Sequence, residues 1–452
     1  MDERVFLPKG TRDFMPDAMR RRLYVIGIVR EVFERFGFEP LETPSFERIE
    51  TLAGRYGDEG EKLIYKILER GEGGKTGAAD LALRYDLTVP LARVMAMHPE
   101  LRLPFKRYQM QPVWRADRPQ KGRYREFWQC DVDVCGTTSL LADSECLAVV
   151  AAALDALGFR EYTIRVNDRR ILSSLARLAG ADSPRREAEV LVALDKLDKI
   201  GREGVDRELV ERGFLATSAL WAALDVPAGG ELRALHDRLD PTARAGAETL
   251  GRVVDAAIGL GVAPRRIRVD PTIARGLGYY TGMVFETEVV QPKIGSISSG
   301  GRYDELIGMF AGRPIPSVGA SLGLERIITV MEELGMLPSS EGVPRVMVAV
   351  YGPETLAPTL AAAKMLRDAG IATDLFADEA KLGRQLKHAN ARGYRWVVVV
   401  GPEEVAKDAV SLKDLASGAQ ETLSLADAIR RIADETVSFG IDSRAWPLRS
   451  RS

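Results

Sequence analysis

The pattern of apolar segments changes at residues 337–344, and this change indicates at least two separate folding units. The segment reads LPSSEGVP, a composition typical of a linker. After it, short apolar strands alternate with amphipathic helical segments. We predict a β-α-β-α-β order at 345–350, 355–369, 372–376, 380–392 and 396–400. This alternation favours a small, separate α/β domain.

The larger part of the chain, before the linker, combines strands with little helix between them. Residues 14–36 have the apolar spacing of an amphipathic helix. Between residues 63 and 134, β-type runs such as KRYQMQPVW and EFWQCDVDV alternate with turns and one helix near 91–97. Strands that follow one another this closely favour an antiparallel sheet over a doubly wound one.

A helical segment interrupts this larger part. Residues 171–261 are rich in Ala, Leu, Arg and Glu and break at glycines, which indicates a helical insertion. We predict that strands resume at 267–269, 283–290 and 294–299, followed by a helix at 322–334. The predicted fold class is therefore α+β, with an antiparallel sheet core, a helical insertion and a C-terminal α/β domain.

The composition of the whole chain excludes several classes of protein. Its 452 residues are 46% hydrophobic and 28% charged, which is typical of a soluble globular protein. The longest apolar runs are too short to cross a bilayer, and the N-terminus lacks the apolar region of a secretory signal. The net charge of −2 neither indicates nor excludes a nucleic-acid partner. We therefore expect a cytoplasmic protein with no membrane segment.

The cysteines and the glycine-rich segments carry no site of their own. Cys130, Cys135 and Cys146 are too few for a disulfide framework and lack the partners of a zinc site, so we interpret them as reduced thiols. The run 74–76 (GKT) ends like a P-loop, but Glu69 stands where the first glycine is needed, which favours a hairpin loop. The glycines at 276–282 have the wrong spacing for a dinucleotide site.

The segment 113–133 has the most informative charge pattern. It places four arginines and a lysine in a strand–loop–strand that turns at PQKG. Gln129, Asp131 and Asp133 then follow at period two, so they share one strand face. A solvated basic hairpin would explain the arginines alone. Arginines beside acidic and amide groups instead suit a ligand that carries both phosphate and cationic groups.

This segment resembles motif 2 of the class II aminoacyl-tRNA synthetases, in the form found in the histidyl enzymes. The resemblance continues in order to about residue 435. The other matching segments are 7–13 (LPKGTRD, N-terminal signature), 36–44 (FGFEPLETP, motif 1), 83–88 (LRYDLT, substrate-binding strand), 275–282 (RGLGYYTG, histidine signature), 299–304 (SGGRYD, glycine-rich strand) and 323–326 (GLER, motif 3). The spellings RYDLT and QCDVD are more similar to the eukaryotic-type branch of the family.

The resemblance implies a domain organisation and a reaction. It implies a class II catalytic domain at 1–335 with the helical insertion at about 171–261, an anticodon-binding domain at 345–435 and a tail at 436–452. The implied reaction activates L-histidine with ATP and transfers it to the 3′ end of tRNA(His). Mg²⁺ is expected to arrive with the ATP phosphates, with no metal site from protein side chains alone. The motif 1 proline implies a homodimer.

The resemblance also implies a role for each matching residue. Arg115 and Arg275 are the implied catalytic residues, both directed at the α-phosphate. ATP is expected to contact Arg115, Arg123 and Arg326. The implied histidine-binding residues are Asp86, Thr88, Gln129, Asp133, Arg275, Tyr279 and Tyr280. The tRNA acceptor stem is expected to meet Arg118, Gln120 and Lys121. The histidine signature departs from the family at Gly278, where an acidic residue is usual.

Each assignment has an ordinary structural alternative. Asp131 and Asp133 could pair with neighbouring arginines, Tyr279 and Tyr280 could be a strand pair, and Arg326 could lie on a helix surface. For the whole chain, the alternatives are a regulatory subunit of histidine biosynthesis, an RNA-binding sensor without chemistry, and a class II synthetase of other specificity. The regulatory subunits lack the C-terminal domain and usually lose the ATP-binding arginines. Arg115, Arg275 and Arg326 are all present here, as is the C-terminal domain.

Overall fold

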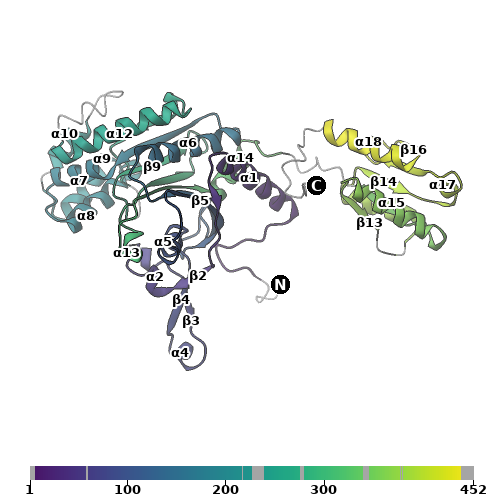
Figure 1. The fold of residues 1–452 in the computed structure, drawn as a ribbon, viewed down its shortest axis with the longest axis horizontal. Helices are drawn as coiled ribbons and strands as arrows, with labels where there is room; N and C mark the ends of the chain where they lie inside the picture. The colour runs from purple at the N-terminus through teal and green to yellow at the C-terminus, as the bar shows by residue number, and fades with distance from the viewer. Residues whose placement is uncertain are drawn as a thin grey trace. The chain divides into compact units, whose positions relative to one another are not determined.

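The computed structural model describes residues 6–56, 60–215, 217–225, 239–274, 279–338, 346–376, 378 and 380–438. The chain divides into two compact units, Met1–Met336 and Leu337–Ser452, shown as a ribbon in Figure 1. Arg275 and Gly278, the linker beyond Pro338 and most of the predicted tail lie outside the described residues.

A large sheet forms the centre of the first unit. Among the described residues it has eight strands, in the order β1 (Glu39–Pro40), β5 (Phe105–Trp114), β6 (Glu126–Cys135), β11 (Ser317–Gly323), β10 (Ser298–Arg302), β9 (Met283–Val289), β7 (Tyr162–Asp168) and β8 (Ile267–Val269). Neighbours are antiparallel except for the parallel pairs β1–β5 and β7–β8. The predicted antiparallel core is confirmed.

The strand predictions differ in detail from the structure. The segment predicted as a strand at 294–299 is largely irregular, and β10 begins at Ser298. The helix predicted from residue 322 begins at Leu324, because Ser317–Gly323 is strand β11. Neither β11 nor β7 was predicted from the sequence.

Helix α1 (Pro16–Arg35) packs on α6 (Leu140–Ala156) and α14 (Leu324–Glu333), and both of these pack on the sheet. Helix α1 buries Val25, Val29, Val32 and Phe33, which recur at helical spacing on one face. Helix α6 buries most of its residues and begins at Ser139, whose hydroxyl accepts the Leu141 N–H. The three cysteines are buried and free.

A smaller sheet stands beside the large one. It joins β2 (Phe46–Arg48), β4 (Ala79–Leu83) and β3 (Lys66–Leu68), next to the short helix α2 (Ile49–Leu52). Strands β3 and β4 pair antiparallel and are connected through the one-turn helix α4 (Glu72–Lys75), which Figure 1 shows at the end of a projecting hairpin. The hairpin interpretation of the GKT run is thus confirmed. Helix α5 (Thr88–Met97) follows β4.

The segment between β7 and β8 is helical. It contains α7 (Arg169–Leu178), α8 (Pro184–Leu194), α9 (Leu197–Glu211), α10 (Thr217–Leu224) and α12 (Pro241–Gly259). Helix α7 begins directly after β7, because Asp168 caps it by accepting the Arg170 N–H. Helix α12 packs on α6 and α7, which attaches this helical segment to the sheet unit.

The second unit has a sheet with helices on both faces. The strand order is β13 (Thr373–Leu375), β12 (Val346–Ala349), β14 (Trp396–Val399), β15 (Val410–Asp414) and β16 (Gln420–Leu423). The helices are α15 (Leu356–Asp368), α16 (Leu382–Ala391), α17 (Pro402–Ala406) and α18 (Leu425–Ser438). Val346 and Val348 belong to one buried cluster, and Met347 and Ala349 to another. The predicted β-α-β-α-β order is confirmed up to β14.

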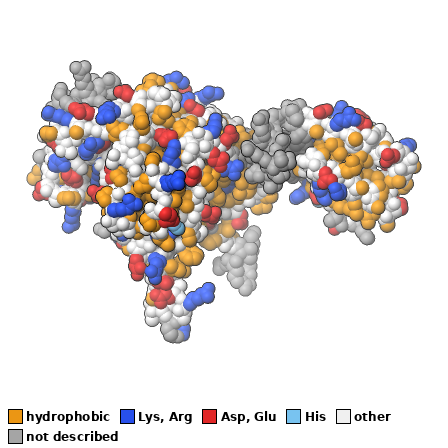
Figure 2. Space-filling view, in the orientation of Figure 1, with side chains coloured by type: hydrophobic (Ala, Val, Ile, Leu, Met, Phe, Trp, Pro, Cys, Tyr) orange, Lys and Arg blue, Asp and Glu red, His pale blue; other side chains and the backbone are white. Residues whose placement is uncertain are grey.

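The described surface has no single dominant sign of charge. Figure 2 shows basic and acidic side chains interspersed over the visible face, which agrees with the net charge of −2. An RNA contact would therefore depend on local groups. Within the described residues, no helix combines the length and the apolar character that spanning a bilayer requires.

Candidate active site

Strand β6 presents a row of polar side chains in the middle of the large sheet. Gln129, Asp131 and Asp133 alternate with apolar residues, and both sets are buried. The period of two directs the polar row to one face of the sheet. Burying three such groups is unfavourable unless each has a partner or a ligand, so this row indicates a functional site.

Asp133 is held from two sides. The Tyr303 hydroxyl donates a hydrogen bond to its Oδ1, and Nη2 of the fully buried Arg107 lies 2.7 Å from its Oδ2. The alternative of a pairing with a neighbouring arginine is thus realised, by an arginine on β5. Burial raises the pKa of Asp133, although Arg107 and Tyr303 oppose that shift.

Asp86 lies between β4 and α5 and is 1% exposed. Its Oδ1 accepts the Val89 N–H at 3.0 Å and the Tyr56 hydroxyl at 3.2 Å. Its Oδ2 is buried without a hydrogen-bond partner among the described residues. Burial raises the pKa of Asp86, and Arg115 is among the groups that lower it. A buried acceptor of this kind fits a cationic donor, because an unsatisfied carboxylate oxygen is costly.

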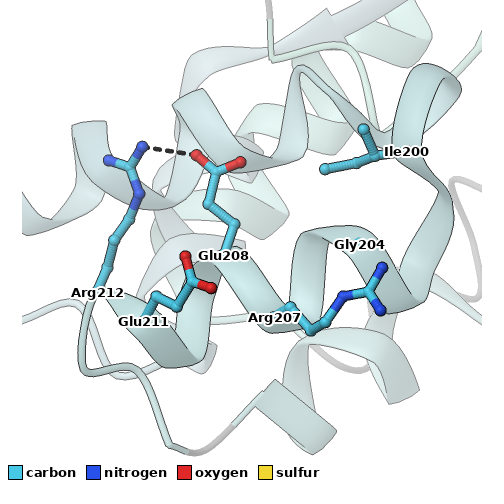
Figure 3. Close-up of a pocket in the computed structure, with 6 residues that line it drawn as sticks. All are labelled: Ile200, Gly204, Arg207, Glu208, Glu211 and Arg212. Atoms are coloured by element: carbon cyan, nitrogen blue, oxygen red, sulfur yellow. Dashed lines mark hydrogen bonds and ion pairs between the residues drawn. The ribbon is translucent and has the colours of Figure 1, made fainter.

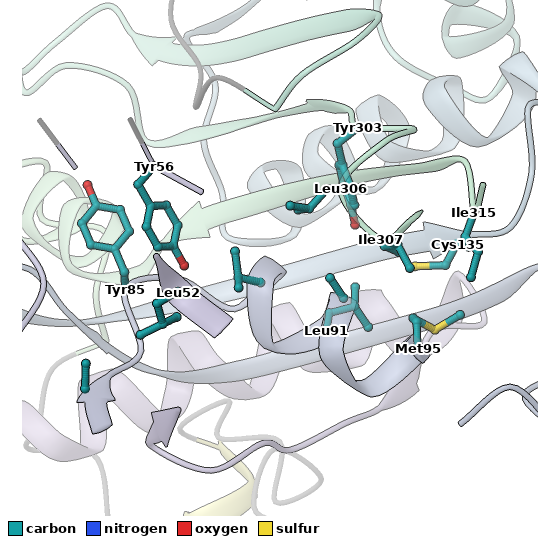
Figure 4. Packing of buried hydrophobic residues seen from close by; sticks show 13 residues of the cluster. Leu52, Tyr56, Tyr85, Leu91, Met95, Cys135, Tyr303, Leu306, Ile307 and Ile315 are labelled. Carbon is teal, nitrogen blue, oxygen red and sulfur yellow. The ribbon is translucent and has the colours of Figure 1, made fainter. Parts of the chain in front are cut away.

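Tyrosine rings form the floor beside these carboxylates. Figure 4 shows Tyr56, Tyr85 and Tyr303 within one buried cluster, together with Leu91 and Met95 of α5. Tyr279 and Tyr280 pack against the same cluster and lie 5.0 Å apart between ring centroids. Burial raises the pKa of Tyr280, and the nearby carboxylates raise it further. The hydroxyls therefore stay protonated and can donate.

Arg115 lies at the rim, directly after β5. Its Nε donates to the Tyr85 carbonyl at 3.0 Å, and its guanidinium lies 4.3 Å from the Tyr85 ring and 5.2 Å from the Phe127 ring. Stacking of this kind holds a guanidinium plane in place. A rigid fork of donors beside Asp86 suits the binding of a phosphate oxygen.

The loop after Arg115 makes its own ion pairs. Arg123 donates to Asp117 Oδ2 from Nε at 3.0 Å and from Nη2 at 2.8 Å, and the Lys121 Nζ lies 2.5 Å from Glu333. Gln120 and Arg123 pair as an isolated β-bridge, while Arg118 and Gln120 are exposed. To bind ATP, Arg123 would have to break its hydrogen bonds to Asp117 or contact Asp117 and a phosphate at the same time.

Arg326 lies in the first turn of α14. Its Nη1 donates to the Ser296 carbonyl, and its side chain passes close to Gly122 and Gly295. It therefore joins the helix to the tip of the loop after Arg115 and to the segment before β10. This position places it at the same rim as that loop.

A buried junction that was not predicted supports this rim. Glu325 accepts from Nη2 of Arg12 at 2.5 Å, from Nη1 of Arg22 at 2.7 Å and from the Trp128 N–H at 3.3 Å. The Arg12 guanidinium also lies 3.4 Å from the Tyr124 ring centroid. The N-terminal signature is thus part of the rim. The sequence of this signature matched the family, but the role of Arg12 became clear only from its contacts in the structure.

The segment that leads to Arg275 is fixed by β7. The Asn167 Nδ2 donates to the carbonyls of Pro271 at 3.1 Å and Ile273 at 3.2 Å, and Arg165 Nε donates to Asp270 at 2.9 Å. Arg165 and Asn167 were not predicted from the sequence, because nothing in the sequence of β7 indicates a contact with residues 270–273.

Gly319 on β11 lies directly opposite Asp133 on β6. A Cβ at this position would lie 2.0 Å from Asp133 Oδ1 and 2.9 Å from the Val132 carbonyl oxygen. We predict that Gly319→Ala displaces the Asp133 carboxylate, raises at least tenfold the KM for the histidine substrate that the resemblance implies, and lowers stability by about 1–3 kcal/mol. Activity assays and thermal unfolding measure the two effects. Gly251→Ala, where a Cβ meets nothing within 4 Å, is the control; equal behaviour of the two variants would contradict the prediction.

A shallow hollow of about 440 Å³ lies elsewhere, on helix α9. Figure 3 shows its lining, which is Ile200, Gly204, Arg207, Glu208, Glu211 and Arg212. The hydrogen bond from Arg212 to Glu208 crosses its wall. None of the predicted site residues lines this hollow, and its charged side chains have the ordinary character of an exposed helix face.

The antiparallel sheet, its polar row and the arginine rim, accompanied by a separate α/β unit, define a class II aminoacyl-tRNA synthetase. A family model described as histidyl-tRNA synthetase matches residues 10–327, and one described as an anticodon binding domain matches residues 345–435. The chain belongs to the histidyl-tRNA synthetase family and is an aminoacyl-tRNA ligase.

Individual relatives agree with this membership. The histidine–tRNA ligase of Gloeobacter violaceus is 42% identical, over 94% of this chain and 97% of its own. That of Cytophaga hutchinsonii is 40% identical, over 95% of this chain and 100% of its own. The crystal structure of histidyl-tRNA synthetase from Nostoc sp. PCC 7120 matches with a TM-score of 0.79 and 33% identity, over 95% of this chain and 99% of its own.

These matches bear on the expected branch of the family. The relatives are bacterial, so they do not support the expectation of a eukaryotic-type branch. A Bacillus halodurans structure titled as an ATP phosphoribosyltransferase regulatory subunit/histidyl-tRNA synthetase matches with a TM-score of 0.72 at 22% identity. That match shows the fold alone.

Proposed function

We propose that the pocket over β6 is where this ligase activates L-histidine with ATP, before transfer to the 3′ end of tRNA(His). The observation that carries this proposal is the neighbouring placement of Asp86 and Arg115. The Asp86 Oδ2 is a buried acceptor without a hydrogen-bond partner among the described residues, and Arg115 is bound through its Nε to the carbonyl of Tyr85, the residue before Asp86. The two groups provide adjacent counter-charges for an ammonium group and a phosphate.

The amino-acid end of the pocket is proposed to bind both charged and ring groups of histidine. The ammonium group would be bound by Asp86, Thr88 and Gln129. The imidazole would be bound by Asp133 and Tyr280, with Tyr279 beside them. Asp133 already accepts from the Tyr303 hydroxyl through Oδ1 and forms an ion pair with Arg107, but its Oδ2 makes no hydrogen bond among the described residues and can accept from a further donor. An apolar side chain of similar size would leave these groups unpaired and be rejected.

The chemistry requires charge stabilisation more than covalent participation. The histidine carboxylate attacks the α-phosphorus in line, the bond to the bridging oxygen breaks, and pyrophosphate leaves. Arg115 is proposed to stabilise the negative charge on the α-phosphate oxygens, with Arg275 acting from the amino-acid side. Arg326 and Arg123 would bind the more distant phosphates or the nucleoside. Bidentate guanidinium groups suit each of these positions.

Mg²⁺ is proposed to enter with ATP. Within the described residues, no three His, Cys, Asp or Glu side chains lie together where they could hold an ion. The ion would be bound mainly through phosphate oxygens, where it would neutralise the charge of the leaving pyrophosphate.

The remaining assignments concern tRNA and assembly. Residues 1–335 are proposed as the catalytic domain, with the insertion at about 171–261, and residues 345–435 as the anticodon-binding domain. The exposed side chains of Arg118 and Gln120, with Lys121, are proposed to contact the acceptor stem. We further propose a homodimer formed through motif 1, and action in the cytoplasm, where tRNA is used. The spellings RYDLT and QCDVD remain the sole support for a eukaryotic-type branch.

The proposal is tested by pyrophosphate exchange measured with histidine and, separately, with each other amino acid. We expect ATP-dependent exchange with histidine alone, followed by charging of total tRNA. Histidine binding without exchange would contradict the proposal and would point to the regulatory subunit.

A further inference from the structure

The amide of Gln129 is fixed in one orientation. Its Nε2 donates to Ser321 Oγ at 2.9 Å and faces the Asp131 carboxylate, at 3.4 Å from Oδ1 and 3.5 Å from Oδ2. Its Oε1 is buried and has no hydrogen-bond partner within the described part of the chain. An amide beside an ionised carboxylate must present its NH₂ group, because that carboxylate can only accept.

Asp131 itself is 3% exposed and lies in the middle of the sheet. It pairs in register with Gln109 on β5 and Ser321 on β11. The charges that act on it come from Arg107 on β5, Asp133 on β6 and Asp86 before α5, while Tyr280 before β9 and the Cys130 thiol on β6 lie within its field. It therefore lies between the proposed ammonium-binding and imidazole-binding groups.

We propose that Asp131 is a positioning residue, which holds the Gln129 amide with its oxygen directed at the ammonium group of the amino-acid substrate. This inference rests on the proposed function, because it assigns a role within the same site. With Asp131 ionised, Gln129 Oε1 joins Asp86 Oδ2 as an acceptor for the ammonium group. When Asp131 is protonated, its carboxyl group can itself donate a hydrogen bond, so it no longer requires the NH₂ group of the Gln129 amide. The amide can then rotate and direct its NH₂ toward the ammonium group instead.

The ionisation of Asp131 falls within an accessible pH range. Burial raises its pKa to about 7, with Arg107 opposing and Asp133 reinforcing this shift. Because the acceptor state requires the ionised form, the positioning effect is present above that pH and is lost as the pH falls through it. Asp131→Asn cannot ionise and should behave at every pH like the protonated wild-type residue.

The experiment compares wild type and Asp131→Asn with two ligands that differ only in the ammonium group. Histidine carries that group, and 3-(imidazol-4-yl)propionate lacks it. By calorimetry at pH 8, we expect Asp131→Asn to weaken histidine binding at least tenfold and to leave the propionate within twofold. The ratio of wild-type to Asp131→Asn affinity for histidine should shrink between pH 8 and pH 6, since titration of the ligand cancels in this ratio. Asp155→Asn is the matched control, in a separate network with Tyr162 and Arg266.

The outcomes separate the two hypotheses. Absence of histidine-dependent exchange in the wild type would overturn the proposed function. With normal wild-type exchange, equal weakening of both ligands by Asp131→Asn would overturn the positioning role and indicate a general structural one. Thermal unfolding of both variants identifies a loss of folding, and Ser321→Ala, which removes the other acceptor of the Gln129 amide, then provides a milder form of the same test.

Discussion

Replacing Arg115 with alanine is expected to reduce the kcat for histidine-dependent pyrophosphate exchange by about a thousandfold, or about 4 kcal/mol of transition-state stabilisation. The guanidinium lies near the Tyr85 and Phe127 rings and its Nε donates to a backbone carbonyl, so it is in place before the substrate binds. Charge develops on the α-phosphate oxygens during attack, and a preorganised donor stabilises that state more than bound ATP. Single-turnover formation of the adenylate measures the effect.

Two further variants define what the Arg115 result means. Arg115→Lys keeps the charge but loses the planar fork, and we expect it to recover only a small part of the activity. Arg185→Ala changes an arginine of α8 whose side chain is 90% exposed, and it should leave exchange unchanged. Exchange by Arg115→Ala within threefold of wild type would remove Arg115 from the reaction.

Arg275→Ala is the second large prediction, with near loss of adenylate formation and an unchanged fold. Its side chain lies outside the described residues, so the prediction depends on the histidine signature and on the anchoring of the segment before it. Asn167 binds that segment through two carbonyls, up to Ile273. A second cation at the α-phosphate would act together with Arg115, so the double variant should lose little more than either single one. Wild-type-like exchange by Arg275→Ala would contradict the proposed assignment.

The fold was most predictable where the pattern of the sequence was strong. The strands at β5 and β6 are long, apolar on alternate positions and separated by a clear turn, and the sequence placed them almost completely. The order of elements from β12 to β14 followed from short valine-rich runs between amphipathic helices. In both regions local preference and tertiary packing agree.

Strand β11 shows why prediction failed elsewhere. It reads SVGASLG, and small residues have low strand propensity. The structure requires them, because Gly319 lies against Asp133 and leaves no space for a Cβ. The small residues that the pocket requires therefore lower the strand propensity of this segment, and the strand is not predicted from its sequence. Strand β7, in contrast, contains a polar Arg165–Asn167 pattern that fits only with its distant partners.

The site was predicted unevenly for a similar reason. Residues that belong to a recognisable family motif, such as Asp86 and Asp133, could be predicted from the sequence. The groups that hold them could not, because Tyr56 and Arg107 come from distant segments with no special local context, and the glycine-rich motif that contains Tyr303 did not indicate its contact with Asp133. Sequence analysis thus favoured the residues proposed to touch the substrate over those that orient them.

The junction at Glu325 has a consequence for how the molecule is made. It joins Arg12 to a residue 313 positions later in the chain. During synthesis, residues up to the start of α14 must therefore emerge from the ribosome before the N-terminal signature can make this contact. A nascent chain that stops short of α14 would expose Arg12 and Arg22 without their shared carboxylate. Affinity for ATP should consequently arise late and in a single step, rather than growing as the strands emerge.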